Sequence, residues 1–165
     1  ISPLPGAVGC HPSQHVTAPS IALLDTWHDL SRGWIKMITI AGEMQGAEEL
    51  CRHAVKLGIV VSLGHSMAEG DTVHSLADAG ASLVTHLGNG LPNQVHRHRN
   101  SIWASLADDR LKAMMITDGE HLPTDVITSF VRSKGSERVI VTSDVAPVAG
   151  LPPGVYTWGA GKVKV

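Results

Sequence analysis

Short hydrophobic runs alternate with longer amphipathic segments along most of the chain. A continuous apolar run predicts a strand that is buried on both faces, whereas apolar residues at helical spacing predict a helix with one buried side. The expected strands cover residues 36–43, 59–64, 82–86, 111–118 and 138–144. The expected helices cover residues 20–32, 45–57, 68–79, 101–108 and 123–134.

Strands that alternate with helices in this way are typical of a parallel sheet built from βα units. Because such connections are short and right-handed, successive strands are expected to lie side by side. Polar residues occupy the carboxyl end of every expected strand: Glu43, His65, His86, Asp118 with His121, and Asp144. Sites built from the ends of several strands favour a (β/α)8 barrel over an open doubly wound sheet, whose Gly-rich phosphate loop is missing from this sequence.

A complete barrel of this type needs about 250 residues, whereas the chain has 165. We therefore predict an α/β fold, a partial (β/α)8 TIM-type barrel with about five βα units, as a catalytic domain over residues 1–150. Residues 151–165 are expected to begin a hairpin, with strands at 154–158 and 162–165 around a turn at 159–161. Ile1 is not a usual first residue, so we expect the chain to be part of a longer protein.

Composition indicates a globular protein that acts on small molecules. The formal net charge is −2, which favours neither nucleic acid nor an anionic membrane as a partner. No hydrophobic run has the roughly 20 residues of a membrane span. Cys10 and Cys51 form no CxxC pair, so we expect two free thiols and a reducing, cytoplasmic location.

Two histidines end neighbouring strands of the predicted sheet. A single histidine at such a place is usually structural, but His65 and His86 together would supply nitrogen ligands for a catalytic divalent metal. Glu43 is a candidate for the third ligand inside this chain. Its alternative role is a carboxylate that stabilises the start of the following helix.

Asp144 ends the last expected strand in the sequence Thr-Ser-Asp. It could simply cap a loop. In a metal-dependent hydrolase, a carboxylate opposite the histidines would take a proton from water and pass it to the leaving group. His121, three residues after Asp118, could bind a substrate hydroxyl or carbonyl group.

A basic run at residues 96–99, His-Arg-His-Arg, lies in the long loop after His86. Most charged runs are solvated surface. Its position near Gly88, Asn89 and Gly90, whose backbone amides would be accessible, instead suggests anion binding, because arginine offers a planar pair of donors to phosphate. A small phosphorylated substrate would fit such a site.

Four motifs occur in a fixed order: Ser-Leu-Gly-His-Ser, Thr-His-Leu-x-Asn-Gly, Asp-Gly-x-His and Thr-Ser-Asp-x-Ala-Pro-x-Ala-Gly. Together they resemble the N-acetylglucosamine-6-phosphate deacetylases of the amidohydrolase superfamily, over nearly the whole chain. The resemblance implies a metal-dependent amidohydrolase barrel in which His65 and His86 bind the metal and Asp144 is the catalytic acid and base. The expected cofactor is a divalent ion, zinc ahead of iron, cobalt or manganese.

The resemblance also implies a set of substrate-binding residues. Asn89, Gly90 and Arg97 would hold the sugar phosphate. His121 would contact the substrate, and Cys10 with His11 would line the sugar site. The expected partner is therefore a small phosphorylated amino sugar, and the full-length protein is expected to be a homodimer.

The same resemblance changes the prediction for the third metal ligand. The metal-binding glutamate of the family lies in a Glu-Gly-Pro motif just ahead of a segment like residues 1–3, which places it outside this chain. Glu43 matches a different glutamate, in Leu-Ala-Pro-Glu. The chain departs from the family by having Ala-Gly-Glu there and Asn-Gly in place of the commoner Asn-Ala-Met, so the identity of the substrate stays open.

The predicted reaction is hydrolysis of the acetamide of N-acetylglucosamine 6-phosphate to glucosamine 6-phosphate and acetate. The 165-residue chain alone is expected to be inactive. Two alternatives stay open: a related amidohydrolase that acts on another N-acyl sugar or a cyclic amide, and a sugar-phosphate-binding fragment without turnover.

Overall fold

The computed structural model describes residues 1–158 and 161–165. Five parallel strands form one sheet in the order β1-β2-β3-β4-β5, which confirms the expected adjacency of successive strands. The strands are β1 (Met37–Ile40), β2 (Val60–Leu63), β3 (Leu83–Val84), β4 (Lys112–Ile116) and β5 (Val139–Thr142). β3 is shorter than expected because its regular pairing ends two residues before His86, where the backbone turns left-handed.

All five expected helices are present. They are α1 (Ile21–Leu30), α2 (Ala47–Lys56), α3 (Gly70–Asp78), α4 (Ser101–Ala107) and α5 (Thr124–Lys134), with short 3-10 helices η1 (Ser13–His15) and η2 (Ser136–Arg138). Ser20 caps α1 by accepting from the backbone N–H of Leu23, and Asn100 caps α4 in the same manner. α2 and α3 each begin two residues later than expected, because the loops after β1 and β2 extend further.

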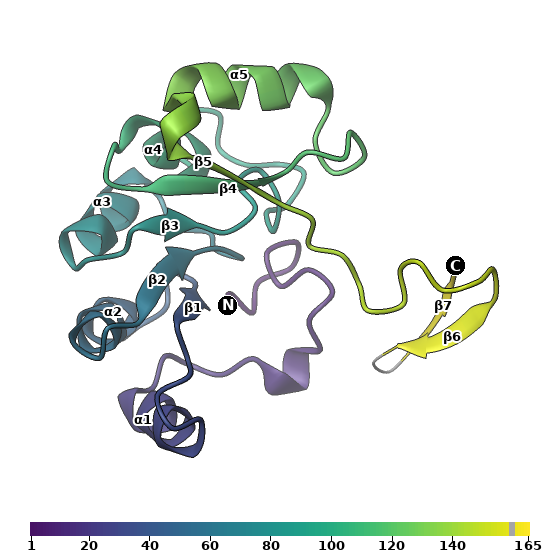
Figure 1. Ribbon diagram of the computed structural model, residues 1–165. Helices are drawn as coiled ribbons and strands as arrows, with labels where there is room; N and C mark the ends of the chain where they lie inside the picture. Colours follow the sequence, from purple (N-terminus) through teal and green to yellow (C-terminus); the bar gives the residue numbers. More distant parts are fainter. Residues whose placement is uncertain (159–160) are drawn as a thin grey trace.

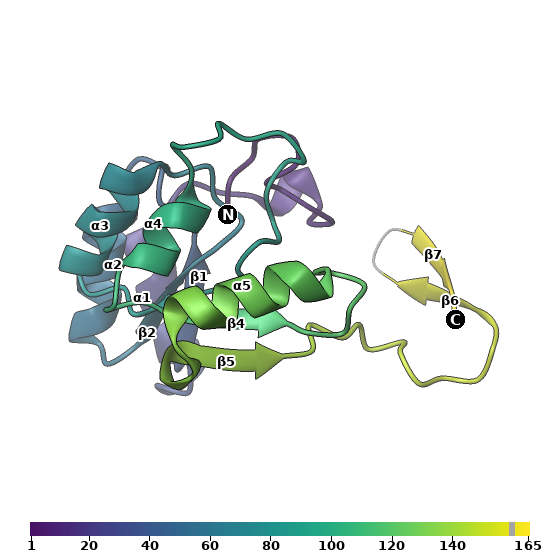
Figure 2. The ribbon, with the colours of Figure 1, turned by 90° about the horizontal axis from the view of Figure 1, so that it is seen from above.

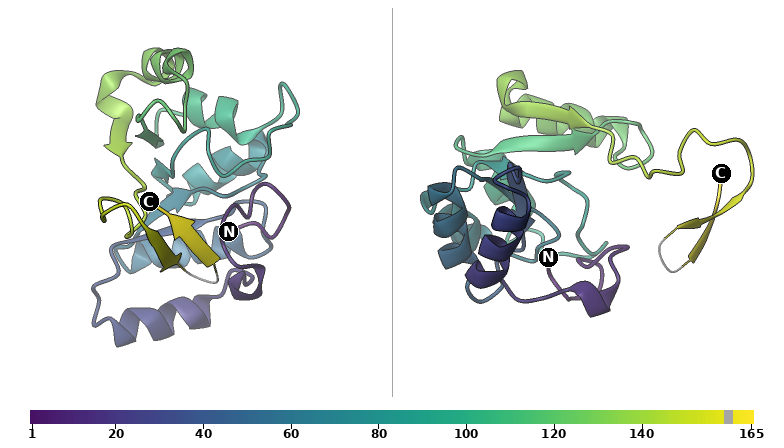
Figure 3. Two further views of the ribbon diagram at one scale, coloured as in Figure 1. Left: turned by 90° about the vertical axis from the view of Figure 1, so that its right-hand side faces the viewer. Right: turned by 60° about the horizontal axis from the view of Figure 1, so that its bottom comes forward.

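The sheet is strongly curved, with its helices on the outer side (Figure 1). The N-terminal segment, residues 1–20, runs across the opposite, inner side of the curve, as Figures 2 and 3 also show. Among the described residues, β1 and β5 each pair with one strand, so the sheet is open at both edges. This arrangement is a partial (β/α)8 barrel of five βα units, as the sequence predicts.

The hydrophobic core is formed jointly by the strands and the helices that cover them. Val61 of β2 and Met115 of β4 are fully buried, as are Cys51 and Ala54 of α2. Both cysteines are free thiols, as expected, with Cys10 exposed. Burial of these apolar side chains anchors the strands and so fixes the positions of the loops at their carboxyl ends.

The inner side of the sheet carries a small layer of hydroxyl groups. The Thr85 hydroxyl lies 2.9 Å from that of Thr39 and 2.6 Å from that of Ser62. Gly64 makes room for this layer, because a Cβ at that position would lie only 2.7 Å from Cβ of Thr85. Ser62 lies one residue before the end of β2, and Thr85 lies immediately after β3.

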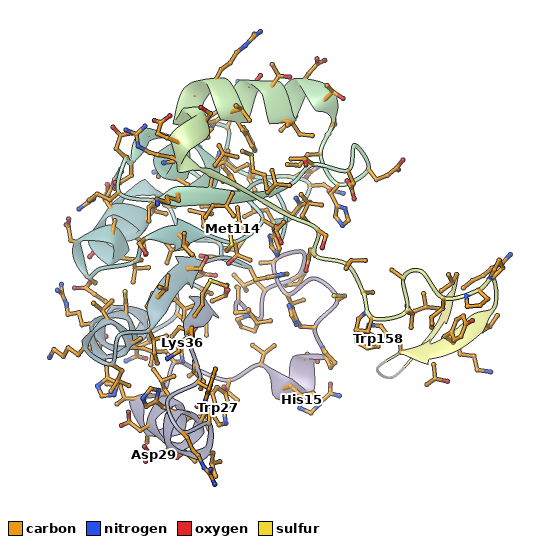
Figure 4. The ribbon with its side chains drawn as sticks, in the orientation of Figure 1. His15, Trp27, Asp29, Lys36, Met114 and Trp158 are labelled. Atoms are coloured by element: carbon orange, nitrogen blue, oxygen red, sulfur yellow. The ribbon has the colours of Figure 1, made fainter. Side chains whose placement is uncertain are left out.

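The end of the chain forms a separate antiparallel pair, β6 (Val155–Trp158) and β7 (Gly161–Lys164). The pair stands apart from the curved sheet, and Figure 4 shows Trp158 on it, away from the body of the molecule. The expected turn at 159–161 lies partly outside the described residues, and the division into domains at residue 150 stays a prediction. Among the described residues, no helix is long and apolar enough to cross a membrane.

Candidate metal and active site

Three of the predicted site residues share an unusual backbone conformation. His65, His86 and Asp144 have φ values of 47°, 31° and 48°, and Arg32 is the remaining non-glycine residue with a positive φ in the described part of the chain. Such conformations cost about 1–3 kcal/mol each and persist only where neighbouring groups hold them, which is common at functional sites. Each of the three residues follows the end of a strand: β2, β3 or β5.

The two predicted metal ligands meet at the ends of β2 and β3. Nε2 of His65 lies 3.0 Å from Nε2 of His86, and the rings are nearly perpendicular with centroids 4.7 Å apart. Two nitrogens that bind one ion at about 2.0–2.1 Å lie roughly 2.9–3.4 Å apart for ligand angles near 90–110°. The observed separation therefore fits a shared divalent ion.

The N-terminal loop holds His65 in place. Its Nδ1 lies 2.7 Å from the carbonyl oxygen of Ala7, so Nδ1 carries the proton and Nε2 keeps its lone pair for a ligand. The backbone N–H of Ser2 donates to the carbonyl of His65 at 2.8 Å. Burial lowers the pKa of His65, and the positive charge that His86 can carry lowers it further, which favours the neutral imidazole that a metal requires.

His86 is buried and packs closely against the loop that follows it. The backbone N–H of Asn89 donates to the carbonyl of His86 at 2.8 Å. Gly90 lies against both rings: an added Cβ would be 2.9 Å from Cε1 of His86 and 3.1 Å from Nδ1 of His65. Nδ1 of His86 has no hydrogen-bond partner among the described residues.

A pocket lies beside His65, between the loops that follow β2 and β3. Its lining includes His65, Ser66 and the predicted substrate-binding residues Asn89 and Gly90. The side-chain nitrogen of Asn89 is buried without a partner in the described structure. A ligand acceptor would satisfy this donor.

The loop that contains Cys10 and His11 lies on the same side of the sheet. The ring of His11 contacts that of His65 edge to face, with centroids 4.6 Å apart. Asp144 is exposed, and its negative charge raises the pKa values of both His11 and His65 against the larger lowering effect of burial. Within the described residues, Asp144 makes no side-chain hydrogen bond or ion pair with the histidine pair.

Arg97 and His121 are not brought into contact with the histidine pair. The side chain of Arg97 is exposed and makes no ion pair within the described residues, while its carbonyl accepts from the indole N–H of Trp103 at 2.8 Å. Nδ1 of His121 lies 2.7 Å from Oδ2 of Asp118. The backbone N–H and the imidazole of His121 lower the pKa of Asp118 to about 2.

The carboxylate of Glu43 is hydrogen-bonded to the loop that follows β2. Its two carboxylate oxygens accept from the hydroxyl of Ser66 at 2.5 Å and from the backbone N–H of Met67 at 2.8 Å. Within residues 1–158 and 161–165, no three His, Cys, Asp or Glu side chains are arranged to hold a metal. The site thus contains a pair of adjacent imidazoles, and Glu43 binds the loop next to it.

Known proteins give an independent comparison. No protein-family model matches the chain. The chain is 33% identical to the N-acetylglucosamine-6-phosphate deacetylase of Bacillus subtilis over 162 residues, which are 98% of this chain and 41% of that protein. It is 32% identical to the N-acetylgalactosamine-6-phosphate deacetylase of Escherichia coli O157:H7 over 149 residues, which are 90% of this chain and 39% of that protein.

The structure superposes on solved deacetylases. For the N-acetylglucosamine-6-phosphate deacetylase of Thermotoga maritima the TM-score is 0.84 at 32% identity, covering 96% of this chain and 42% of that one. The chain is thus similar to N-acetylglucosamine-6-phosphate deacetylases over almost its whole length, in sequence and in fold. A mutant of the Mycobacterium smegmatis enzyme, solved with N-acetyl-D-glucosamine-6-phosphate, gives a TM-score of 0.88 at 29% identity over 96% of this chain and 42% of that one.

This chain spans about two fifths of the length of the deacetylases that it matches. Sequence reasoning missed the two backbone groups that contact His65, the carbonyl of Ala7 and the amide of Ser2, and the hydrogen bonds of Ser66 in the loop after it. The two backbone groups leave no signal in a sequence. Ser66 did leave one, because it is the last residue of the Ser-Leu-Gly-His-Ser motif.

Proposed function

We propose that the protein containing this chain removes the acetyl group from an N-acetylated amino sugar 6-phosphate, with N-acetylglucosamine 6-phosphate as the first candidate. The observation that carries the proposal is the 3.0 Å approach of the two Nε2 atoms of His65 and His86. It occurs in a chain that is 33% identical to a deacetylase of this specificity. Hydrolysis would give the free amino sugar phosphate and acetate.

The proposed cofactor is a divalent metal ion held by His65 and His86, with zinc ahead of iron, cobalt or manganese. When bound, such an ion polarises the acetamide carbonyl and lowers the pKa of water. The imidazole of His65 suits this role because Ala7 holds its proton on Nδ1. Further ligands would complete the coordination, since the chain supplies only these two at the described site.

Asp144 is the proposed acid and base. Its carboxylate would accept a proton from the attacking water and then deliver it to the nitrogen of the leaving amine. Support comes from its left-handed backbone at the end of β5 and from its electrostatic effect on His65 and His11. An exposed carboxylate at the end of β5 is accessible to water and substrate.

The sugar phosphate is proposed to bind along the loop after β3. Asn89 and Gly90 line the pocket beside the histidines, and the side-chain nitrogen of Asn89 is an unused donor among the described residues. We assign Arg97 to the phosphate, His121 to a substrate hydroxyl or carbonyl, and Cys10 with His11 to the sugar ring. The homodimer and the cytoplasmic location stay predictions.

A second candidate substrate is N-acetylgalactosamine 6-phosphate. The observation that favours it is the 32% identity to a deacetylase of that specificity in Escherichia coli O157:H7. The two sugars differ only in the orientation of the hydroxyl at C4. The proposed metal and acid-base chemistry would be the same for both.

An acetate-release assay on the intact natural protein tests the proposal. Both 6-phosphates, both unphosphorylated sugars and a cyclic amide should be compared, with and without a metal chelator. We expect turnover of a 6-phosphate that chelation abolishes and Asp144→Asn reduces by at least about 100-fold, with metal content unchanged in the variant. Binding of the sugar phosphate without any acetate release would instead indicate a non-catalytic binding protein.

A further inference from the structure

One buried hydroxyl ties the loop after β2 to the loop after β1. The hydroxyl of Ser66 donates to Oε2 of Glu43 at 2.5 Å and accepts from the backbone N–H groups of Gly42 and Ala68, each at 3.1 Å. The other oxygen of Glu43 accepts from the backbone N–H of Met67 at 2.8 Å. A hydroxyl has one proton and two lone pairs, so every bonding position of Ser66 is used. The bonds with Gly42 and Glu43 join the two loops, and the bond with Ala68 lies within the loop after β2.

The residue immediately before this junction is His65. Its φ of 47° is unfavourable for a side chain of this kind, so the surrounding structure must hold it. Ala7 orients the ring and Ser2 holds the carbonyl group. Both of these contacts come from the N-terminal loop, whereas the Ser66 junction ties the backbone just after His65 to the loop after β1.

We propose that Ser66 and Glu43 are positioning residues that keep the backbone of His65 in its left-handed conformation and so hold its Nε2 beside that of His86. The inference rests on the proposed metal-binding role of the two histidines. Neither Ser66 nor Glu43 is a proposed metal ligand, and Ser66 also lines the pocket beside His65. Glu43 acts on the metal site through the loop that carries His65.

The chain contains a matched pair for comparison. The hydroxyl of Ser75 donates to Oε2 of Glu48 at 2.8 Å, which joins α3 to α2 in the helical layer outside the sheet. The chemistry is the same serine-to-glutamate hydrogen bond. Because this pair lies away from the strand ends, Ser75→Ala controls for the loss of such a bond alone. Glu48→Gln controls for loss of the carboxylate and also removes the ion pair of Glu48 with Arg52.

Metal affinity is the first measurement. In the intact natural protein, Ser66→Ala and Glu43→Gln should weaken Zn²⁺ binding about 10-fold in a calorimetric titration, the usual effect of losing a group that orients a metal ligand. Both should also change the visible absorption spectrum of the Co²⁺ form, which reports ligand geometry. Ser66→Thr keeps the hydroxyl and should restore most of the affinity, while Ser75→Ala and Glu48→Gln should bind Zn²⁺ like the wild type.

A second measurement needs no metal. The Nδ1–H of His65, which donates to Ala7, should give a slowly exchanging low-field imidazole signal in the NMR spectrum of the metal-free protein. Ser66→Ala and Glu43→Gln should broaden or remove this signal, and the Ser75 and Glu48 controls should keep it. If Ser66→Ala does not fold, the zinc titration and the NMR measurement are made on the isosteric Glu43→Gln variant.

The possible failures are distinct. A wild-type protein that binds neither Zn²⁺ nor Co²⁺ would contradict the proposed function, and the imidazole signal would then decide the positioning role by itself. Wild-type Zn²⁺ affinity and an unchanged imidazole signal in folded Ser66→Ala and Glu43→Gln would overturn the positioning role while leaving the proposed function intact.

Discussion

Gly90 lies so close to the ring of His86 that a Cβ on Gly90 would be 2.9 Å from Cε1 of His86. Gly90 also has a φ of 66°, which glycine adopts without strain. The loop after β3 can therefore cover the two imidazoles only if this position has no side chain. The same glycine closes the Thr-His-Leu-x-Asn-Gly motif.

Gly90→Ala should lower both the unfolding free energy and the Zn²⁺ affinity of the histidine pair. The strained backbone should cost about 1–2 kcal/mol of unfolding free energy, and the contact with His86 should lower Zn²⁺ affinity as well. Gly119→Ala is the matched control, because Gly119 has a φ of 84° but open space around it. Denaturant unfolding and zinc titration of both variants make the comparison, and equal zinc affinity in the two would contradict the role assigned to Gly90.

Arg97→Ala should weaken the binding of phosphorylated substrate. In the proposed reaction, KM for the 6-phosphate should rise about 10-fold or more with little change in kcat, because arginine would bind the phosphate equally in the ground state and the transition state. The unphosphorylated sugar should be unaffected. Arg99→Ala, in the same exposed loop, is the control, and an equal loss with both sugars would exclude a role for Arg97 at the phosphate.

The strands and their order could be predicted from the sequence because each is a short apolar run that follows a helix. The histidine pair could be predicted for the same reason, since parallel strands in chain order bring His65 and His86 to neighbouring ends. Their left-handed backbones and their 3.0 Å approach could not, because these depend on contacts from residues far away in sequence, such as Ala7.

Glu43 shows the limit of reading one residue at a time. At the end of a strand, a carboxylate could equally bind a metal, stabilise a helix or hold a loop, and composition does not distinguish these roles. The distinction came from the partner, Ser66, which lies 23 residues further along the chain. Such pairs become visible only when the strands are placed side by side.

Asp108 should contribute stability that is lost in acid. Its buried carboxylate accepts hydrogen bonds from the guanidinium of Arg110 and, at 2.8 Å, from Nδ1 of His74. These bonds hold the pKa of Asp108 well below its usual range, and Arg110 has the larger effect. Asp108→Asn should therefore lower the unfolding free energy by about 2 kcal/mol near neutral pH.

The sign of the pH dependence follows from the lowered pKa of Asp108. The unfolded chain takes up a proton near pH 3.9 while the folded protein resists it, so the contribution is complete above about pH 5 and declines as the pH falls. The difference between wild type and Asp108→Asn should shrink below about pH 4. The measurement is urea unfolding across this pH range, with Asp109→Asn, at the exposed neighbouring carboxylate, as the control. A difference in unfolding free energy between wild type and Asp108→Asn that stays constant with pH would contradict the prediction.

The two thiols should differ sharply in reactivity. Cys51 is fully buried against the carbonyl of Leu76, and burial raises the pKa of its thiol to about 11, so little reactive thiolate is available near pH 8. Cys10 is exposed in the loop beside His11. A thiol reagent should label Cys10 within minutes in the folded protein and label Cys51 only after unfolding in guanidinium.

Substrate protection then tests the assignment of Cys10 to the sugar site. N-acetylglucosamine 6-phosphate should slow the labelling of Cys10, because a bound sugar would cover the loop, whereas inorganic phosphate should have less effect. Cys10→Ser should abolish the fast phase and Cys51→Ala should leave it unchanged. Labelling of Cys10 that is indifferent to saturating sugar phosphate would place this thiol outside the binding site, since a ligand that contacts a thiol must restrict the approach of the reagent.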